Sequence, residues 1–190
     1  MMFNRHTEME LSTAIKLIEK GVSDGGEAQT DEAHSWLDLG AGNGLFTRAL
    51  ASLPPSGSVV TAIDKRSSFS PTQSDLKGTT RIETRVADFT TLRSEDLKVN
   101  GILMANSLHY VKDQKGFLMK ALDSLLPGGR LIVVEYDTDR GNMWVPYPLS
   151  FTSLSDLMNG ISGCTTTKLA TVPSQFQRGG IYCALIRPAT

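Results

Sequence analysis

The chain reads Trp36-Leu37-Asp38-Leu39-Gly40-Ala41-Gly42-Asn43-Gly44 at the point that decides its fold, where an apolar strand runs directly into a glycine-rich turn. Residues 45–53 follow with the apolar spacing of a helix. Glycines permit a tight turn and a close backbone approach to a ligand at the carboxyl end of a strand, where ligands bind in open α/β sheets. The stretch therefore predicts a strand, a ligand-binding turn and a helix in succession.

Short apolar runs recur after this stretch and alternate with helical or polar segments. This alternation is typical of a parallel sheet with crossover helices. A second connecting helix is predicted from the apolar spacing around Phe117 to Leu125, with Pro127-Gly128-Gly129 ending it. The connection at 67–78 contains Pro71 and many small polar residues, so it predicts a short helix at most. Strands are expected at 35–39, 59–63, 81–87, 101–105 and 130–136.

Both ends of the chain add secondary structure to this pattern. An apolar stripe at 11–18 predicts an N-terminal helix ended by Gly21, and the polar stretch 23–33 is interpreted as a mobile linker. Ser153 with Asp156 is typical of a capping box, ahead of the helical stripe Leu154, Leu157, Met158 and Ile161. Residues 165–172 and 181–187 predict a terminal hairpin.

The fold class that follows is α/β: a Rossmann-like three-layer sandwich around a mainly parallel seven-stranded sheet with an antiparallel last strand. No repeat or composition break marks a second domain, so residues 1–190 are interpreted as one domain. Its expected parts are the N-terminal helix and linker (1–33), a cofactor-binding core (34–136), and a substrate-side loop, helix and hairpin (137–190).

Composition limits the partners. The chain has 19 Lys and Arg against 20 Asp and Glu, which disfavours nucleic acid and predicts a small-molecule partner. No apolar run reaches membrane-spanning length, and the charged N-terminus does not resemble a secretion signal, so a cytoplasmic protein is expected. Cys164 and Cys183 lack metal-ligand spacing and are interpreted as buried thiols, with no metal expected. The sequence does not indicate an oligomeric state.

The ligand of the glycine turn can be narrowed from its spacing. Leu45 stands where a dinucleotide fingerprint needs a third glycine, and no Gly-Lys-Ser or Gly-Lys-Thr follows to bind a triphosphate. Asp64 ends the next strand about 20 residues later, the spacing at which a carboxylate meets a ribose diol. Asp88 and Phe89, after the third strand, could bind an adenine ring, although Asp88 could also cap a short helix.

These residues closely resemble the class I S-adenosylmethionine (SAM)-dependent methyltransferases, and residues 104–110 and 126–135 resemble the small-molecule branch within that class. The first motif of that family reads acid-x-Gly-x-Gly-x-Gly, which here is Asp38, Gly40, Gly42 and Gly44. The resemblance implies that the glycine turn approaches the methionine part of SAM, that Asp64 binds the ribose hydroxyls and that Asp88 binds the adenine. The cofactor-binding residues that it implies are Asp38, Gly40, Ala41, Gly42, Gly44, Asp64, Lys65, Asp88, Phe89 and Asn106.

The residues after the fourth strand extend the resemblance, because Asn106-Ser107-Leu108-His109-Tyr110 lies where the methyl group of SAM should emerge. His109 and Tyr110 are candidates to orient a substrate or accept its proton, with a packing role as the alternative for His109. The Asn-Pro-Pro-Tyr signature of amino-methylating nucleic-acid and glutamine enzymes is absent.

The loop after the fifth strand is expected to determine substrate specificity, because specificity residues lie in loops more often than in the helices and strands that support them. Its candidate substrate residues are Tyr136, Arg140, Trp144 and Tyr147. The alternative is an ordinary connection whose aromatic side chains pack on the sheet.

The expected reaction is methyl transfer from SAM to a small-molecule acceptor by in-line attack on the sulfonium methyl group. An alternative from another class is a non-catalytic module that binds a cofactor or partner. A third is an NAD-dependent oxidoreductase, for which the third glycine and a hydride-transfer site are missing.

Overall fold

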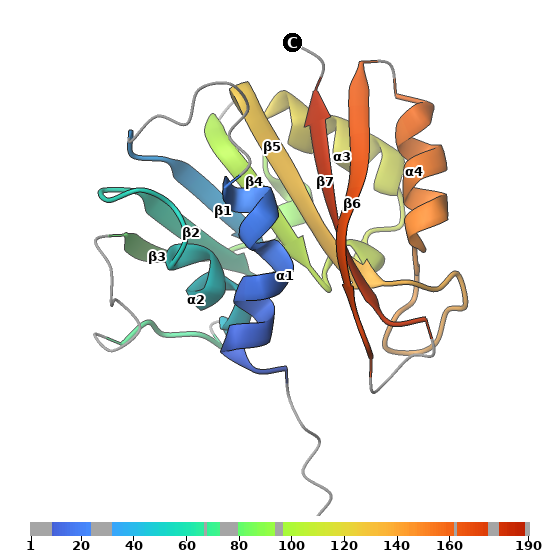
Figure 1. Cartoon of the computed structure of the whole chain (residues 1–190), viewed down its shortest axis with the longest axis horizontal. Helices are drawn as coiled ribbons and strands as arrows, with labels where there is room; N and C mark the ends of the chain where they lie inside the picture. Colours follow the sequence, from blue (N-terminus) through green and yellow to red (C-terminus); the bar gives the residue numbers. More distant parts are fainter. Residues whose placement is uncertain are drawn as a thin grey trace, which may run out of the picture.

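A computed structural model of the chain describes residues 9–23, 32–66, 68–72, 80–93, 97–161, 163–174 and 179–188. A seven-stranded sheet runs through it in the order β3-β2-β1-β4-β5-β7-β6 (Figure 1). Pairs from β3 to β5 are parallel, whereas β7 is antiparallel to both β5 and β6. The strands are β1 (Ser35–Leu39), β2 (Val59–Asp64), β3 (Arg81–Val86), β4 (Val99–Ala105), β5 (Leu125–Tyr136), β6 (Cys164–Val172) and β7 (Ile181–Pro188).

Helices cover both faces of the sheet, because each strand presents apolar side chains alternately to opposite sides. Figure 1 shows α1 (Leu11–Ser23) and α2 (Leu45–Ala51) on the same side of the sheet. Trp36 packs in the cluster on the face that they cover, whereas its neighbour Leu37 packs in the cluster on the other face. That second face is covered by α3 (Gln114–Asp123) and α4 (Phe151–Asn159), together with two short 3-10 helices, η2 (Phe89–Thr91) and η4 (Leu108–Tyr110). The expected α/β three-layer sandwich is confirmed.

The sheet order places a ligand site between β1 and β4. The chain moves outward from β1 to β2 and β3 and then returns to the other side of β1 with β4. At such a switch point the loops after neighbouring strands diverge and leave a crevice at their carboxyl ends. The glycine turn after β1 and the segment after β4 meet there, where the Ser107 hydroxyl donates to the Leu39 carbonyl at 2.6 Å.

Two predicted helix boundaries are wrong. Gly21 lies inside α1 and does not end it. Its role is in packing: a Cβ at this position would stand 2.9 Å from the Ile132 side chain, so the glycine lets the helix lie close to β5. The N-cap of α4 is Ser150, whose hydroxyl accepts from the Ser153 backbone N–H at 3.2 Å, so Ser153 is not the capping residue.

The predicted start of the fifth strand is also wrong. Strand β5 begins at Leu125, and Pro127-Gly128-Gly129 lies within it as a register shift against β4, whereas α3 has already ended at Asp123. Of the two cysteines, Cys183 is buried but Cys164 is only partly buried. Most of the predicted linker (24–31) and of the 67–78 connection (67 and 73–78) lies outside the described residues.

Candidate active site

The glycine turn forms the floor of a pocket at the carboxyl ends of β1 and β4. Gly40, Gly42 and Gly44 all have positive φ angles, at 84°, 55° and 80°, which residues other than glycine rarely adopt. A Cβ on Gly40 would stand 2.5 Å from the Ser107 Cβ, whereas a Cβ on Gly42 would have no atom within 4 Å. The turn is therefore packed against its surroundings at Gly40 and open to the pocket at Gly42.

Asp64, at the end of β2, holds this turn in place. One carboxylate oxygen accepts from the Gly42 backbone N–H at 2.9 Å, and the other accepts from the Arg66 N–H at 2.9 Å. The Ser68 hydroxyl donates to the Gly42 carbonyl at 2.5 Å. A carboxylate oxygen has two lone pairs, so both oxygens of Asp64 keep acceptor capacity for a ligand.

Asp38 lies beneath the turn and is buried. It accepts from the Thr47 hydroxyl at 2.6 Å through Oδ2, while its buried Oδ1 has no hydrogen-bond partner. Burial raises the pKa of Asp38 from its ordinary value to about 7, despite the hydrogen bond from Thr47. A carboxyl group in this state gains from a positively charged or hydrogen-bond-donating ligand nearby.

A pH dependence of stability follows from this raised pKa. Between about pH 4 and pH 7 the folded protein keeps the Asp38 proton and the unfolded chain releases it. The contribution of Asp38 to the free energy of unfolding should therefore fall as the pH rises through this window and level off above it. Urea unfolding of the wild type and of Asp38→Asn, from pH 4.5 to 8, measures it. Stability curves that run parallel for the two proteins would contradict the raised pKa.

Lys65 and Asp88 form an exposed ion pair beside the pocket, with 3.0 Å between the Lys65 Nζ and an Asp88 oxygen. Asp88 also caps η2 by accepting from the backbone N–H and the hydroxyl of Thr90. The Thr90 hydroxyl is the main cause of the lowered Asp88 pKa. Phe89 and Thr90 line the pocket, whereas Asp88 does not, so the capping role that the sequence left open for Asp88 is observed.

Asn106 follows β4 in a left-handed conformation, with a φ of 52°. Among the residues that the structure describes, it alone combines a positive φ with a side chain, and such strain concentrates at functional sites. Its side-chain oxygen is buried without a hydrogen-bond partner, and the residue lines the pocket. The side chain is thus placed to bind a ligand.

His109 and Tyr110 are consecutive but point in different directions. His109 is buried: its Nδ1 lies 2.7 Å from a Glu135 carboxylate oxygen, and the other oxygen accepts the His109 backbone N–H at 3.1 Å. Tyr110 is 57% exposed and lines the pocket. The structure therefore brings Tyr110 into the site and keeps His109 behind it, with 4.3 Å between the two ring centroids.

Of the four predicted substrate residues, the structure brings only Trp144 into the pocket. Tyr136 is partly buried, with its ring centroid 6.2 Å from that of His109. Arg140 is exposed elsewhere on the loop, and Tyr147 contributes backbone hydrogen bonds.

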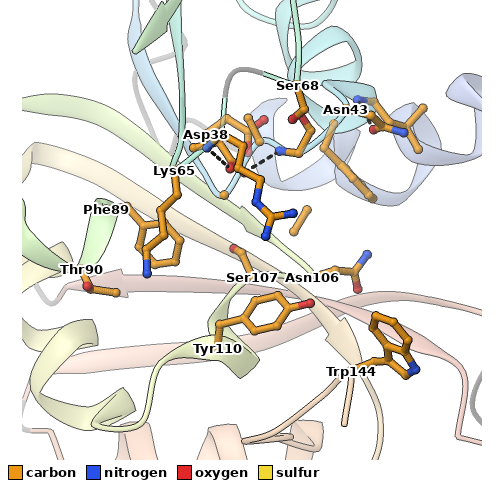
Figure 2. Close-up of a pocket in the computed structure, with 18 of the residues that line it drawn as sticks. Asp38, Asn43, Lys65, Ser68, Phe89, Thr90, Asn106, Ser107, Tyr110 and Trp144 are labelled. Atoms are coloured by element: carbon orange, nitrogen blue, oxygen red, sulfur yellow. Dashed lines mark hydrogen bonds between the residues drawn. The ribbon is translucent and has the colours of Figure 1, made fainter. Parts of the chain in front are cut away.

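The pocket has a volume of about 900 Å³. Ligand pockets usually have about 300–1,000 Å³, so this one has room for a cofactor and a small acceptor together. Figure 2 shows Asp38, Lys65 and Ser68 on one side and Tyr110 and Trp144 on the other. Lining residues that the sequence did not indicate are Asn43, Leu45, Phe46, Arg66, Ser68, Thr90, Ala105, Ser107 and Met143. Most are sequence neighbours of predicted ones, which is the signal that could have found them.

Other kinds of site are not found in the part of the chain that the structure describes. It contains no group of three or more His, Cys, Asp or Glu side chains arranged to hold a metal ion. It also contains no helix of the length and apolarity needed to cross a membrane.

The class of the protein follows from these features. The sheet order with an antiparallel β7, the glycine turn after β1 and the acid ending β2 define a cofactor-binding α/β protein with the methyltransferase topology. A family model described as "Methyltransferase domain" matches residues 37–133, just over half of the chain. The chain belongs to this family of methyltransferases, which confirms the resemblance to SAM-dependent methyltransferases. No curated protein is similar enough in sequence to match.

Several solved structures share this fold. The plantazolicin methyltransferase BpumL in complex with S-adenosylhomocysteine (SAH) has a TM-score of 0.68 at 14% identity, covering 98% of this chain and 87% of that one. The N-methyltransferase NodS from Bradyrhizobium japonicum WM9 has a TM-score of 0.66 at 18% identity, covering 94% and 87%. The CurJ carbon methyltransferase has a TM-score of 0.66 at 19% identity, covering 95% and 59%.

Proposed function

We propose that this chain transfers the methyl group of SAM to a small-molecule acceptor within the pocket between β1 and β4. The observation that carries the proposal is the glycine turn, which Asp64 holds with Gly42 open to a cavity of about 900 Å³. Family membership supports the reaction class, and the NodS and BpumL structures, both in complex with SAH, support the cofactor.

The residues of the pocket fit SAM. The open space at Gly42 admits a ligand against the backbone, and the buried oxygens of Asp38 and Asn106 without partners suit a ligand that donates hydrogen bonds. Asp64 is placed to accept from the ribose hydroxyls, and Phe89 offers a ring to the adenine. In this proposal the remaining contacts come from Gly40, Ala41 and Lys65, which also line the pocket. The sequence resemblance also assigned Gly44 and Asp88 to the cofactor, but neither of them lines the pocket.

When bound, SAM would supply its methyl group to a lone pair of the acceptor, so that the bond from the acceptor to the methyl carbon forms as the carbon–sulfur bond breaks. The electrons of the broken bond stay on sulfur, and any acceptor proton leaves for solvent. The chain has to align the acceptor and exclude water. Alignment alone can contribute about 7–11 kcal/mol. Tyr110 and Trp144 flank the acceptor side, and His109 is a positioning residue behind Tyr110.

The acceptor is proposed to be a small molecule because a pocket of about 900 Å³ leaves room for one beside the cofactor and the chain carries no excess of positive charge. The fold itself does not choose the acceptor atom, since the similar structures include enzymes named for nitrogen and for carbon methylation. A cytoplasmic location stays a prediction, which cell fractionation can test.

Methyl transfer is tested by incubating the protein with methyl-tritiated SAM and fractionated small-molecule extracts. We expect label in one or more acceptor fractions, together with an equal amount of SAH. Asp64→Ala should reduce both signals. Firm binding of SAH without label transfer to any fraction would contradict catalysis and favour the non-catalytic alternative.

A further inference from the structure

The pocket divides into two chemically different halves. The charged side chains that line it, Asp38, Asp64, Lys65 and Arg66, all belong to β1, β2 or the residue pair after β2. The segment after β4 and the loop after β5 contribute side chains without charge in the described structure. These are Asn106, Ser107, Tyr110, Met143 and Trp144. Figure 2 shows Tyr110 and Trp144 across the pocket from Lys65.

The loop after β5 presents two apolar side chains because of a tight turn. Asn142 and Val145 exchange backbone hydrogen bonds of 3.1 and 3.2 Å, and the Asn142 side-chain oxygen accepts from the backbone N–H groups of Trp144 and Val145. Val145 is buried, whereas Met143 and Trp144 at the tip are 85% and 75% exposed. The turn thus uses its polar side chain internally and directs the apolar ones to the pocket.

The acidic groups of this loop are used for its own structure. Asp137 accepts from the Phe151 backbone N–H at 2.9 Å and pairs with Lys168 at 3.0 Å. Asp139 accepts from the Ser150 backbone N–H at 2.9 Å, at the start of α4. Neither carboxylate lines the pocket, so both anchor the loop rather than contact the ligand.

The loop is also joined to the helix that carries Tyr110. The Tyr147 backbone N–H donates to the His109 carbonyl at 3.0 Å, and the Gln114 amide donates to the Tyr147 carbonyl at 2.8 Å. Trp144 and Tyr110 therefore belong to one braced unit. The backbone that carries these two aromatic side chains is therefore fixed before a ligand binds, and such preorganisation lowers the cost of binding.

We infer that the acceptor is a planar aromatic molecule without a negative charge, bound against Tyr110 and Trp144. Aromatic side chains stack with planar rings, and among the described residues this half of the pocket has no cationic side chain to pair with an anion that must give up its water. This inference rests on the proposed function, because it assigns the charged half of the pocket to SAM.

The test compares two probes with the same carbon skeleton and hydroxyl group. SAH-loaded protein is titrated calorimetrically with 1-naphthol and with decahydro-1-naphthol, and the charged 1-naphthoate is a third probe. We expect 1-naphthol to bind about tenfold more tightly than its saturated counterpart. It should also bind more tightly than 1-naphthoate. Trp144→Ala should reduce the preference for the aromatic ring, because only Tyr110 remains, and Trp144→Phe should retain most of it.

Controls separate this inference from the proposed function. Trp144→Ala should melt at the wild-type temperature and bind SAH as the wild type does, because its side chain is largely exposed. Met119→Ala, which removes an exposed apolar side chain of α3 outside the pocket, should keep the preference. Equal binding of the two alcohols, tighter binding of 1-naphthoate, or a preference that is undiminished in Trp144→Ala would overturn the inference. Failure of the wild type to bind SAH would instead overturn the proposed function.

Discussion

Replacing Glu135 by alanine is expected to lower the free energy of unfolding by about 2–6 kcal/mol, because each of two buried polar groups left without its hydrogen-bond partner costs about 1–3 kcal/mol. The Glu135 side chain is 1% exposed. One of its carboxylate oxygens accepts from the His109 backbone N–H, and the other is hydrogen-bonded to the ring Nδ1 of His109. Alanine would leave two buried polar groups without a partner. Urea unfolding followed by circular dichroism measures the change.

Two further variants calibrate that result. Glu83→Ala removes a carboxylate from an exposed pair with Arg81, 2.9 Å apart, and should cost no more than about 1 kcal/mol. Glu135→Gln keeps an acceptor for the backbone N–H and should fall between the two. Because the His109 carbonyl also binds Tyr147, Glu135→Ala should weaken acceptor binding more than SAH binding. A loss of stability no greater than that of Glu83→Ala would show that the buried pair does not hold η4.

Replacing Asp64 by alanine is expected to weaken SAH binding about 100-fold, since hydrogen bonds to charged groups contribute about 1.5–3 kcal/mol each. The carboxylate orders the turn by accepting from the Gly42 N–H, and in the proposed site it also accepts from the ribose hydroxyls. The variant loses both contributions. The loss is measured by the rise in the dissociation constant and by a smaller SAH-induced increase in melting temperature.

Asp113→Ala is the matched control for Asp64→Ala, because Asp113 also accepts a backbone N–H, that of Gly116 at 3.0 Å. It caps α3 on the surface, outside the pocket, so its loss should lower stability by about 1 kcal/mol and leave SAH affinity unchanged. Equal SAH affinity in the wild type and in Asp64→Ala would show that Asp64 does not contribute to cofactor binding.

The cofactor side of the fold could be predicted because its signals are local. A strand, a glycine turn and an acid at the end of the next strand each occupy a few consecutive residues, and the sheet order then brings Gly42 and Asp64 into contact. Strand β1 has the predicted bounds for the same reason.

The acceptor side could not be predicted in the same way, because side-chain direction there depends on distant partners. His109 and Tyr110 are adjacent in sequence, yet Glu135, 26 residues away, draws the histidine inward. In the loop after β5, the turn held by the Asn142 side chain places Met143 and Trp144 at the pocket, whereas Arg140 lies outside it. The cap of α4 was misplaced for a related reason, since two serines three residues apart carry the same local signal.

The central claim is that the pocket between β1 and β4 binds SAM, and calorimetric titration of the wild-type protein with SAH tests it most directly. A dissociation constant near the micromolar range, equivalent to about −8 kcal/mol, is the predicted result. The absence of detectable heat and of any shift in melting temperature, in protein shown to be folded, would contradict it.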